Sequence, residues 1–301
     1  MTLPFLKLHV AGHDFILIDQ DKLEVDKTTH QPAPGVMAEL MLDRRCGIGA
    51  DGCIFMASAK DSSGSERTLT GRLFGIDGRE VSLSPDALLC IARLALDTGR
   101  SSANILTIHG PLTGYSFELK AINSRSFMLT LPYPQVQPLT LIVDGKTAWA
   151  YRVRLRNTYT VAFAIPQGPG AKRVRQALLA MGEKNEIPLV LRMYNKDTIR
   201  FVGPDRIDRV EGAIAAVLSA GFQGFVSESL QTGTEGAIIA EWRGRGGAVS
   251  YASFPPLATS EQASSPAVLI DRGRFWVNPN LDGTIQVIGK AEYIFDGNFD
   301  I

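Results

Sequence analysis

Residues 80–99, EVSLSPDALLCIARLALDTG, carry the signals of a helix from its start to its end. Ser84 suits the N-cap, Pro85 suits the first helical position, and Asp86 complements the positive end of the helix dipole. Leucine, isoleucine and alanine side chains at helical spacing then supply a broad apolar face, and Gly99 suits the C-terminal cap. The stretch therefore predicts one helix that begins after Ser84 and ends near Gly99.

The composition is that of a globular protein with a full hydrophobic core, because 45% of the 301 residues are hydrophobic and 21% are charged. The 31 basic and 31 acidic side chains balance, so no electrostatic argument favours nucleic acid or an anionic membrane as a partner. The N-terminus lacks the pattern of a signal peptide, and no apolar run approaches the roughly 20 residues that span a bilayer. We expect a soluble, cytoplasmic protein.

Cysteine and histidine are scarce. Cys46, Cys53 and Cys90 all lie in the first third of the chain, and no CxxC spacing occurs. This pattern argues against a disulfide framework or a structural zinc site, and the four histidines show no metal-ligand spacing. We expect no metal. Cys90 falls on the apolar face of the predicted helix, where a buried, inert thiol is the expectation.

The second half of the chain repeats the pattern of the first. Residues 203–221, GPDRIDRVEGAIAAVLSAG, again place a proline and an aspartate, Pro204 and Asp205, before an apolar stripe that ends at a glycine. Strand-like segments surround this predicted helix and the one after Ser84, which suggests an internal duplication. Two unrelated amphipathic helices are the alternative. A Pro-rich segment at 132–138, PYPQVQP, reads as a linker between the halves.

Four segments resemble diaminopimelate epimerases. They are FLKLHVAGHDFILID (5–19), DRRCGIGADGCIFM (43–56), GRLFGIDGREVSLSPDALLCIARLAL (71–96) and VIGKAEYIFDGNF (287–299). The resemblance implies an α+β fold of two pseudo-symmetric domains, each a curved sheet wrapped around a central helix, with the site in the cleft between them. We expect an N-terminal domain of residues 1–135 completed by 290–301, and a C-terminal domain of residues 136–289.

In that family two cysteines, one in each half, form a thiol pair that removes and returns a proton without a metal or pyridoxal cofactor. The helix N-termini hold the substrate carboxylate, since unpaired N–H groups and the dipole make an anion site. The resemblance makes Ser84 the counterpart of the first cysteine. The second counterpart lies near Arg209 if residues 203–221 are the equivalent helix, which we favour, or near Tyr251 if WRGRGGAVSY is the equivalent segment. No cysteine follows Cys90, so the two-thiol mechanism is excluded.

The substrate-binding residues of the family have changed as well. By the resemblance, His13 and Gly75 replace asparagines, and Pro85 with Asp86 replaces a Gly-Asn pair. Two like charges a few ångströms apart cost on the order of 4 kcal/mol at an effective dielectric near 20, so an acidic helix start disfavours an amino-acid carboxylate. We therefore do not expect diaminopimelate as the substrate.

One asparagine of the family has a counterpart by either of two matches. Asn157 in RLRNTYTVAFAIP and Asn195 in MYNKDTIRFV compete for the match to the family segment G-N-P-H, whose asparagine contacts substrate. We take Asn157, with Gly75 and Pro85, as the substrate-binding set.

These residues predict a cofactor-independent isomerase, lyase or cyclase in which Asp86, Asp205, His13 and Ser84 perform the acid–base chemistry. If the two helix starts face each other, Asp86 and Asp205 form a carboxylate pair whose pKa values are driven apart. His13 shares or orients the proton transfer, and Ser84 donates to a developing oxyanion. The alternative is an inactive homologue that binds a ligand or a protein. We expect a small-molecule substrate, no nucleic-acid or membrane partner, and allow for a homodimer.

Overall fold

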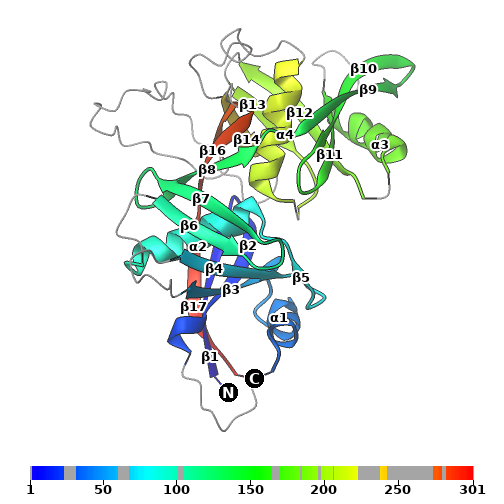
Figure 1. The fold of residues 1–301 in the computed structure, drawn as a ribbon. Helices are drawn as coiled ribbons and strands as arrows, with labels where there is room; N and C mark the ends of the chain where they lie inside the picture. The colour runs from blue at the N-terminus through cyan, green and yellow to red at the C-terminus, as the bar shows by residue number, and fades with distance from the viewer. Residues whose placement is uncertain are drawn as a thin grey trace, which may run out of the picture. The chain divides into compact units, whose positions relative to one another are not determined.

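The computed structural model describes residues 2–23, 32–59, 68–100, 105–164, 170–183, 185–195, 198–205, 207–222, 238–242, 274–279 and 283–300. The chain divides into two compact units, which are Met1–Leu129 with Lys290–Ile301 (unit 1) and Thr130–Gly289 (unit 2). Each unit combines a mixed sheet with helices (Figure 1). This architecture confirms the predicted α+β class. Among the described helices, none is long and apolar enough to cross a membrane.

Unit 1 holds a sheet in the order β17-β1-β2-β3-β4-β6-β7-β8, and the short β5 pairs with β4. The β2–β3 and β4–β6 pairs are parallel and the others are antiparallel. Its elements are β1 (Thr2–Val10), β2 (His13–Asp19), the 3-10 turn η1 (Gln20–Lys22), α1 (Pro34–Leu42), β3 (Gly52–Ala59), β4 (Thr68–Phe74), β5 (Glu80–Val81), α2 (Pro85–Asp97), β6 (Ile105–Gly110), β7 (Tyr115–Ala121), β8 (Ser126–Pro132) and β17 (Glu292–Asp300).

Unit 2 holds a sheet in the order β9-β10-β11-β12-β13-β14-β15-β16. Here β11–β12 and β13–β14 are the parallel pairs. Its elements are β9 (Gln135–Val143), β10 (Lys146–Arg154), β11 (Thr158–Phe163), α3 (Ala171–Met181), β12 (Ile187–Asn195), β13 (Thr198–Val202), α4 (Arg209–Phe222), β14 (Ile238–Trp242), β15 (Arg274–Pro279) and β16 (Thr284–Lys290).

The two sheets repeat the same series of pairings. In each unit an antiparallel hairpin is followed by a parallel step, an antiparallel pair and a second parallel step. A helix precedes the second strand of each parallel step, so α1 corresponds to α3 and α2 to α4. This shared order is what an internal duplication produces.

Helix α2 is the buried helix of unit 1. All residues from Pro85 to Ala92 are buried, as are Leu94 and Ala95, and the helix packs on β1 and β2. Ser84 is the N-cap, and its Oγ accepts the Ala87 N–H at 3.2 Å. Burial of ten of its thirteen residues explains the run of leucine, isoleucine and alanine. The helix predicted from the sequence is confirmed, and Cys90 is buried as expected.

Ser84→Ala is expected to lower the free energy of unfolding by about 1 kcal/mol, because the Ala87 N–H loses its acceptor at a buried helix end. Ser84→Gly should cost only a few tenths of a kcal/mol, since glycine is tolerated at an N-cap. Urea unfolding of the three proteins measures the difference. Equal stability of the alanine variant and the parent would show that the cap contributes nothing.

Three elements differ from the sequence expectation. Helix α4 begins at Arg209, so the expected start at Pro204 is wrong. The predicted linker at 132–138 runs into β9, in which Pro138 pairs with Tyr151. Among the described pairings β9 contacts only β10, and an edge strand tolerates a proline that cannot donate to a second neighbour. Helix α1 was not predicted.

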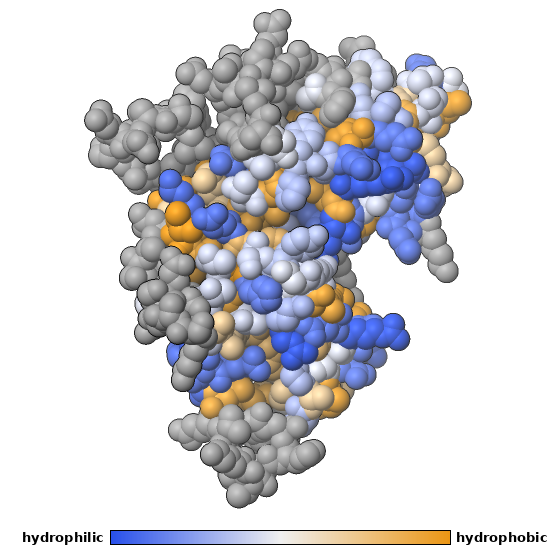
Figure 2. Space-filling view, viewed as in Figure 1, coloured by the Kyte–Doolittle hydropathy of each residue, from blue (hydrophilic) through white to orange (hydrophobic). Residues whose placement is uncertain are grey.

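The visible surface is mixed. On the face drawn in Figure 2, apolar side chains form small patches separated by hydrophilic ones. This distribution fits the balanced charge of the chain, and the described side chains on that face form no single extended apolar patch.

Candidate functional site

The hairpin turn between β1 and β2 positions His13 at the start of β2. Ala11 and Gly12 both have positive φ, 49° and 87°, as a tight two-residue hairpin requires. His13 Nδ1 lies 2.8 Å from Asp86 Oδ2 in the first turn of α2. Both side chains are buried, Asp86 completely and His13 with 8% exposed. The structure thus brings together two of the predicted catalytic residues, 73 positions apart.

The start of α2 supplies the other polar groups of unit 1. Ser84 accepts the Ala87 N–H, so its own hydroxyl proton can still donate to another group. Pro85 at the first helical position removes one N–H from this end of the helix. Gly75 lies in the β4–β5 turn, where its N–H donates to the Arg79 carbonyl and its carbonyl accepts from Gly78. Its described contacts are all within that turn.

The pairing of Asp86 with His13 changes the charge argument made from the sequence. An imidazole beside the carboxylate reduces the repulsion that an approaching anion meets at this helix start. We still predict that the site rejects an amino-acid carboxylate. The charge of Asp86 supports this prediction less strongly than the sequence alone indicates, because His13 lies beside it.

Two further carboxylates lie next to His13. Arg44 Nη2 is 2.9 Å from one oxygen each of Asp14 and Asp51, and Lys7 Nζ is 3.0 Å from Asp14. Burial raises the pKa of the Asp14 carboxyl, but hydrogen bonds with Asp51, Lys7 and Arg44 outweigh burial and hold that pKa below its usual value. Burial and the hydrogen bond to Asp14 raise the pKa of Asp51. Neighbouring carboxyls with separated pKa values are typical of acid–base sites.

In unit 2 a polar cluster surrounds the start of α4. The Glu211 carboxylate accepts from Arg156 Nε at 3.1 Å, from Asn157 Nδ2 at 2.9 Å and from the Tyr159 hydroxyl at 2.8 Å. Burial and the charge of Asp208 raise the pKa of Glu211. Burial also raises the pKa of Tyr159 well above its usual value. This buried acid is therefore held by three side-chain donors.

Asp208, and not Asp205, caps helix α4. Asp208 Oδ1 accepts the Glu211 N–H at 2.8 Å, and the Asp208 carbonyl accepts the Gly212 N–H at 3.0 Å. Asp205 is exposed and lies in the turn before the helix, where its carbonyl accepts from Arg209 Nη2 at 2.6 Å. The pairing of Asp86 with Asp205 at matched helix positions is therefore wrong, because α4 starts later than its glycine and proline suggested.

The repeat matches Asn157 to His13. Phe15 pairs with Gly52, the first residue of β3, and Tyr159 pairs with Ile187, the first residue of β12. His13 and Asn157 each stand two residues earlier. Each contacts a carboxylate in the first turn of the buried helix, Asp86 for His13 and Glu211 for Asn157.

The sequence left two alternative matches to the family open, Asn195 in place of Asn157 and Tyr251 in place of Arg209. Asn195 ends β12 in the hairpin with β13, so it does not occupy the position that corresponds to His13. Tyr251, the alternative counterpart of the second cysteine, lies outside the described residues.

Sequence reasoning missed the Glu211 cluster and the Asp14–Asp51 pair. One signal was present. Asp208-Arg209-Val210-Glu211 has the D-x-x-E spacing of a capping box, which marks a helix start at 208 rather than 204. The Glu211 side chain contacts Asn157 and Tyr159, so only the Asp208 half of that motif is formed as a cap.

Comparison with known proteins returns epimerases and isomerases. No family model matches the chain. A diaminopimelate epimerase from Legionella pneumophila (strain Lens) is 28% identical over 161 residues, which is 54% of each chain. One from Microcystis aeruginosa is 38% identical over 96 residues, 31% of this chain and 30% of the relative. The chain thus matches the Legionella relative over about half its length.

Solved structures match over the whole chain. A phenazine biosynthesis PhzF family protein from Enterococcus faecalis has a TM-score of 0.59 at 12% identity, covering 100% of both chains. A hydroxyproline epimerase from Agrobacterium vitis has a TM-score of 0.57 at 10% identity, covering 99% of this chain and 92% of the other. A methylitaconate-delta-isomerase has a TM-score of 0.52 at 11% identity, covering 99% and 95%. These likenesses show the fold.

Proposed function

We propose that this chain, which belongs to the diaminopimelate epimerase/PhzF superfamily, is a cofactor-independent isomerase-type enzyme that moves a proton with imidazole and carboxyl groups instead of two thiols. The observation that carries the proposal is the buried contact of 2.8 Å between His13 Nδ1 and Asp86 Oδ2. The solved structures with this fold include a hydroxyproline epimerase and a methylitaconate-delta-isomerase by name, which supports an isomerase-type activity for this chain.

His13 is the proposed catalytic residue and Asp86 its positioning residue. A carboxylate accepts and does not donate, so we assign the Nδ1 proton of His13 to the bond with Asp86. That assignment leaves Nε2 to take a proton from carbon and return it. Asp86 has no exposed surface, so it acts through His13 rather than on the substrate. Ser84 would donate to the oxyanion or enolate that forms.

Asp208 is the proposed second acid–base group, in place of Asp205. Ser84 and Asp208 are the N-cap residues of α2 and α4, which are corresponding helices in the repeat. The resemblance to epimerases implies one acid–base residue at each of these two places, and Asp208 lies next to Arg209, the position favoured for the second counterpart. Asn157, Gly75 and Pro85 remain the proposed substrate-binding residues.

Exchange of substrate hydrogen with solvent tests the proposal. The protein would be incubated in heavy water with small unsaturated acids, a set of amino acids and diaminopimelate, and deuterium incorporation measured by mass spectrometry. We expect incorporation into an unsaturated acid or another substrate that is not a free amino acid, unaffected by a metal chelator. We also propose that the substrate is a small molecule and that the protein assembles as a homodimer.

The second candidate function is a binding module without catalysis. It is favoured by one feature, namely that a serine caps α2 where the resemblance implies a catalytic cysteine. Binding of a compound from the set, seen as a rise in melting temperature, without any deuterium incorporation would support this alternative over the enzyme.

A further inference from the structure

The Arg156 guanidinium lies at the edge of the buried Glu211 cluster, and only part of its donors is used. Its Nε donates to Glu211 Oε1 at 3.1 Å, and within the described part of the chain its side chain makes no second hydrogen bond. Nη1 and Nη2 therefore keep their N–H donors for a ligand. The Arg156 side chain is 30% exposed and that of Glu211 only 2%, so the guanidinium is the member of the pair that a solute can reach.

This arginine is held in place before any ligand arrives. Glu211 Oε2 accepts from Asn157 Nδ2 at 2.9 Å and from the Tyr159 hydroxyl at 2.8 Å, which keeps Oε1 directed toward Arg156. A guanidinium anchored through Nε presents its Nη1–Nη2 edge in a fixed direction, and that edge matches the two oxygens of a carboxylate. Binding to a side chain that is already ordered avoids part of the entropic cost of association.

The charges around Arg156 allow an anion to approach. Burial lowers the pKa of Arg156, but the charges of Glu211 and Asp208 outweigh burial and raise that pKa above its usual value, so the group stays cationic. Arg209 adds a second guanidinium at the start of α4. Two cations thus accompany the two carboxyl groups of this cluster, and no excess of negative charge repels an anion there.

The starts of α2 and α4 offer fewer donors to an anion than helix ends usually do. Pro85 has no N–H, and Ser84 Oγ already accepts a further N–H of α2. At the start of α4, Asp208 Oδ1 accepts the Glu211 N–H. A guanidinium nearby in the structure is therefore a stronger anion-binding group than either helix end.

Arg156 also stands beside a residue of the proposed site. It directly precedes Asn157, and both side chains donate to the same carboxylate. By the match of Asn157 to the family segment G-N-P-H, Arg156 takes the place of the glycine. The guanidinium is thus a feature of this chain and is not carried over with the resemblance.

We propose that Arg156 binds the carboxylate of the substrate through Nη1 and Nη2, which makes the substrate a small carboxylic acid. This inference rests on the proposed function, because it assigns the group that holds its substrate. Arg156 binds and takes no part in the proton transfer, so a change at this position should raise KM and leave kcat within about twofold. Lysine keeps a cation for Glu211 but lacks the two-pronged edge, which makes Arg156→Lys the variant of choice.

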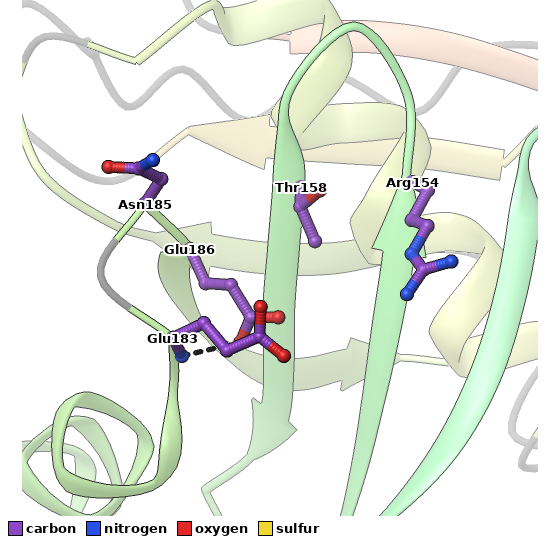
Figure 3. A pocket seen from close by; sticks show the side chains of 5 residues that line it. All are labelled: Arg154, Thr158, Glu183, Asn185 and Glu186. Atoms are coloured by element: carbon purple, nitrogen blue, oxygen red, sulfur yellow. Dashed lines mark hydrogen bonds between the residues drawn. The ribbon is translucent and has the colours of Figure 1, made fainter.

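A pocket of about 250 Å³ in unit 2 is the rival place for an acid, because Arg154 lines it. Figure 3 shows Arg154 on one side of Thr158 and both Glu183 and Glu186 on the other. Arg152 pairs with the two glutamates, at 3.7 Å and 2.5 Å, so one cation already serves two carboxylates there. This surplus of acid disfavours an anion in the pocket, and Arg154→Lys is therefore the matched control.

Calorimetric titration of the full chain with crotonate and but-3-enoate, and with the amides of both, tests the inference without requiring turnover. The amides keep the shape of the acids and lose the charge. We expect the parent to bind the acids at least about tenfold more tightly than the amides. Arg156→Lys should bind the acids about tenfold more weakly than the parent and the amides equally well. A change of preference between two ligands is not produced by a loss of folding.

Arg154→Lys should bind both acids as the parent does. Three results would overturn the inference: equal affinity of the parent for acids and amides, no binding of either acid at about 10 mM, or acid binding that is weakened in Arg154→Lys and not in Arg156→Lys.

Deuterium exchange separates this inference from the proposed function. Exchange in the parent with an unchanged KM in Arg156→Lys would refute the role of the arginine and leave the isomerase standing. Binding of the acids that depends on Arg156, without exchange in the parent, would refute the isomerase and leave the carboxylate site standing.

Discussion

Asp86→Asn is expected to slow deuterium incorporation about 10²–10⁴-fold, with KM changed by no more than about twofold. The asparagine keeps the size of the side chain but presents an amide to His13 Nδ1, 2.8 Å away in the parent. An amide that turns its NH₂ toward Nδ1 moves the ring proton to Nε2, and His13 then cannot accept a proton from carbon. Because Asp86 has no exposed surface, substrate binding should be little affected.

Two other variants separate catalysis from folding. Asp296→Asn changes an exposed aspartate of β17, in the same unit, and should leave the exchange rate as it is. Asp86→Glu keeps an acceptor for Nδ1 and should recover part of the lost rate. An Asp86→Asn protein that has the parent's melting temperature and exchanges at the parent's rate would refute the role of this pair. The measurement requires the substrate identified in the exchange experiment.

Helix α2 was predictable because every local signal agreed with its tertiary surroundings. Ser84, Pro85 and the apolar run all indicate the same start, and ten of the thirteen helix residues are buried. Helix α4 was placed five residues too early because two starts compete. Pro204 and Asp205 fit the first turn of a helix and also fit a β-turn, and only the tertiary structure selects the cap at Asp208.

The candidate site residues, like the helices, were predictable from the sequence only in part. His13 and Asp86 stand in segments that resemble a known family, so both could be named from the sequence although 73 positions separate them. The contacts of Glu211 with Arg156 and Tyr159 also span more than 50 positions, but those residues lie in no recognisable motif. Strand pairing alone brings them to the start of α4. The sequence could therefore suggest Asn157 but not its partner.

Arg156→Leu is expected to lower the free energy of unfolding by about 3 kcal/mol at pH 7, because it leaves the Glu211 carboxylate buried without its cation. The cost lies at the low end for a broken buried pair, since Asn157 and Tyr159 still donate to Glu211. Urea unfolding measures it. Adding Glu211→Gln should restore at least half of the loss, because a neutral amide needs no cation. Arg173→Leu removes an exposed partner of Asp144 and should cost less than about 1 kcal/mol.

The pH dependence of these proteins distinguishes a buried charge from a lost packing contact. Burial and Asp208 raise the pKa of Glu211 in the folded protein above its ordinary value of 4.5. At pH values between 4.5 and the higher pKa of the folded protein, Glu211 binds more protons in the folded state than in the unfolded state. The contribution of Glu211 to stability therefore falls as pH rises through that range. Removal of the Arg156 cation raises the folded pKa further and extends the falling range to higher pH. The deficit of Arg156→Leu should therefore shrink on acidification, as Glu211 takes up a proton. A deficit that stays constant with pH would instead assign the loss to the packing of the arginine side chain.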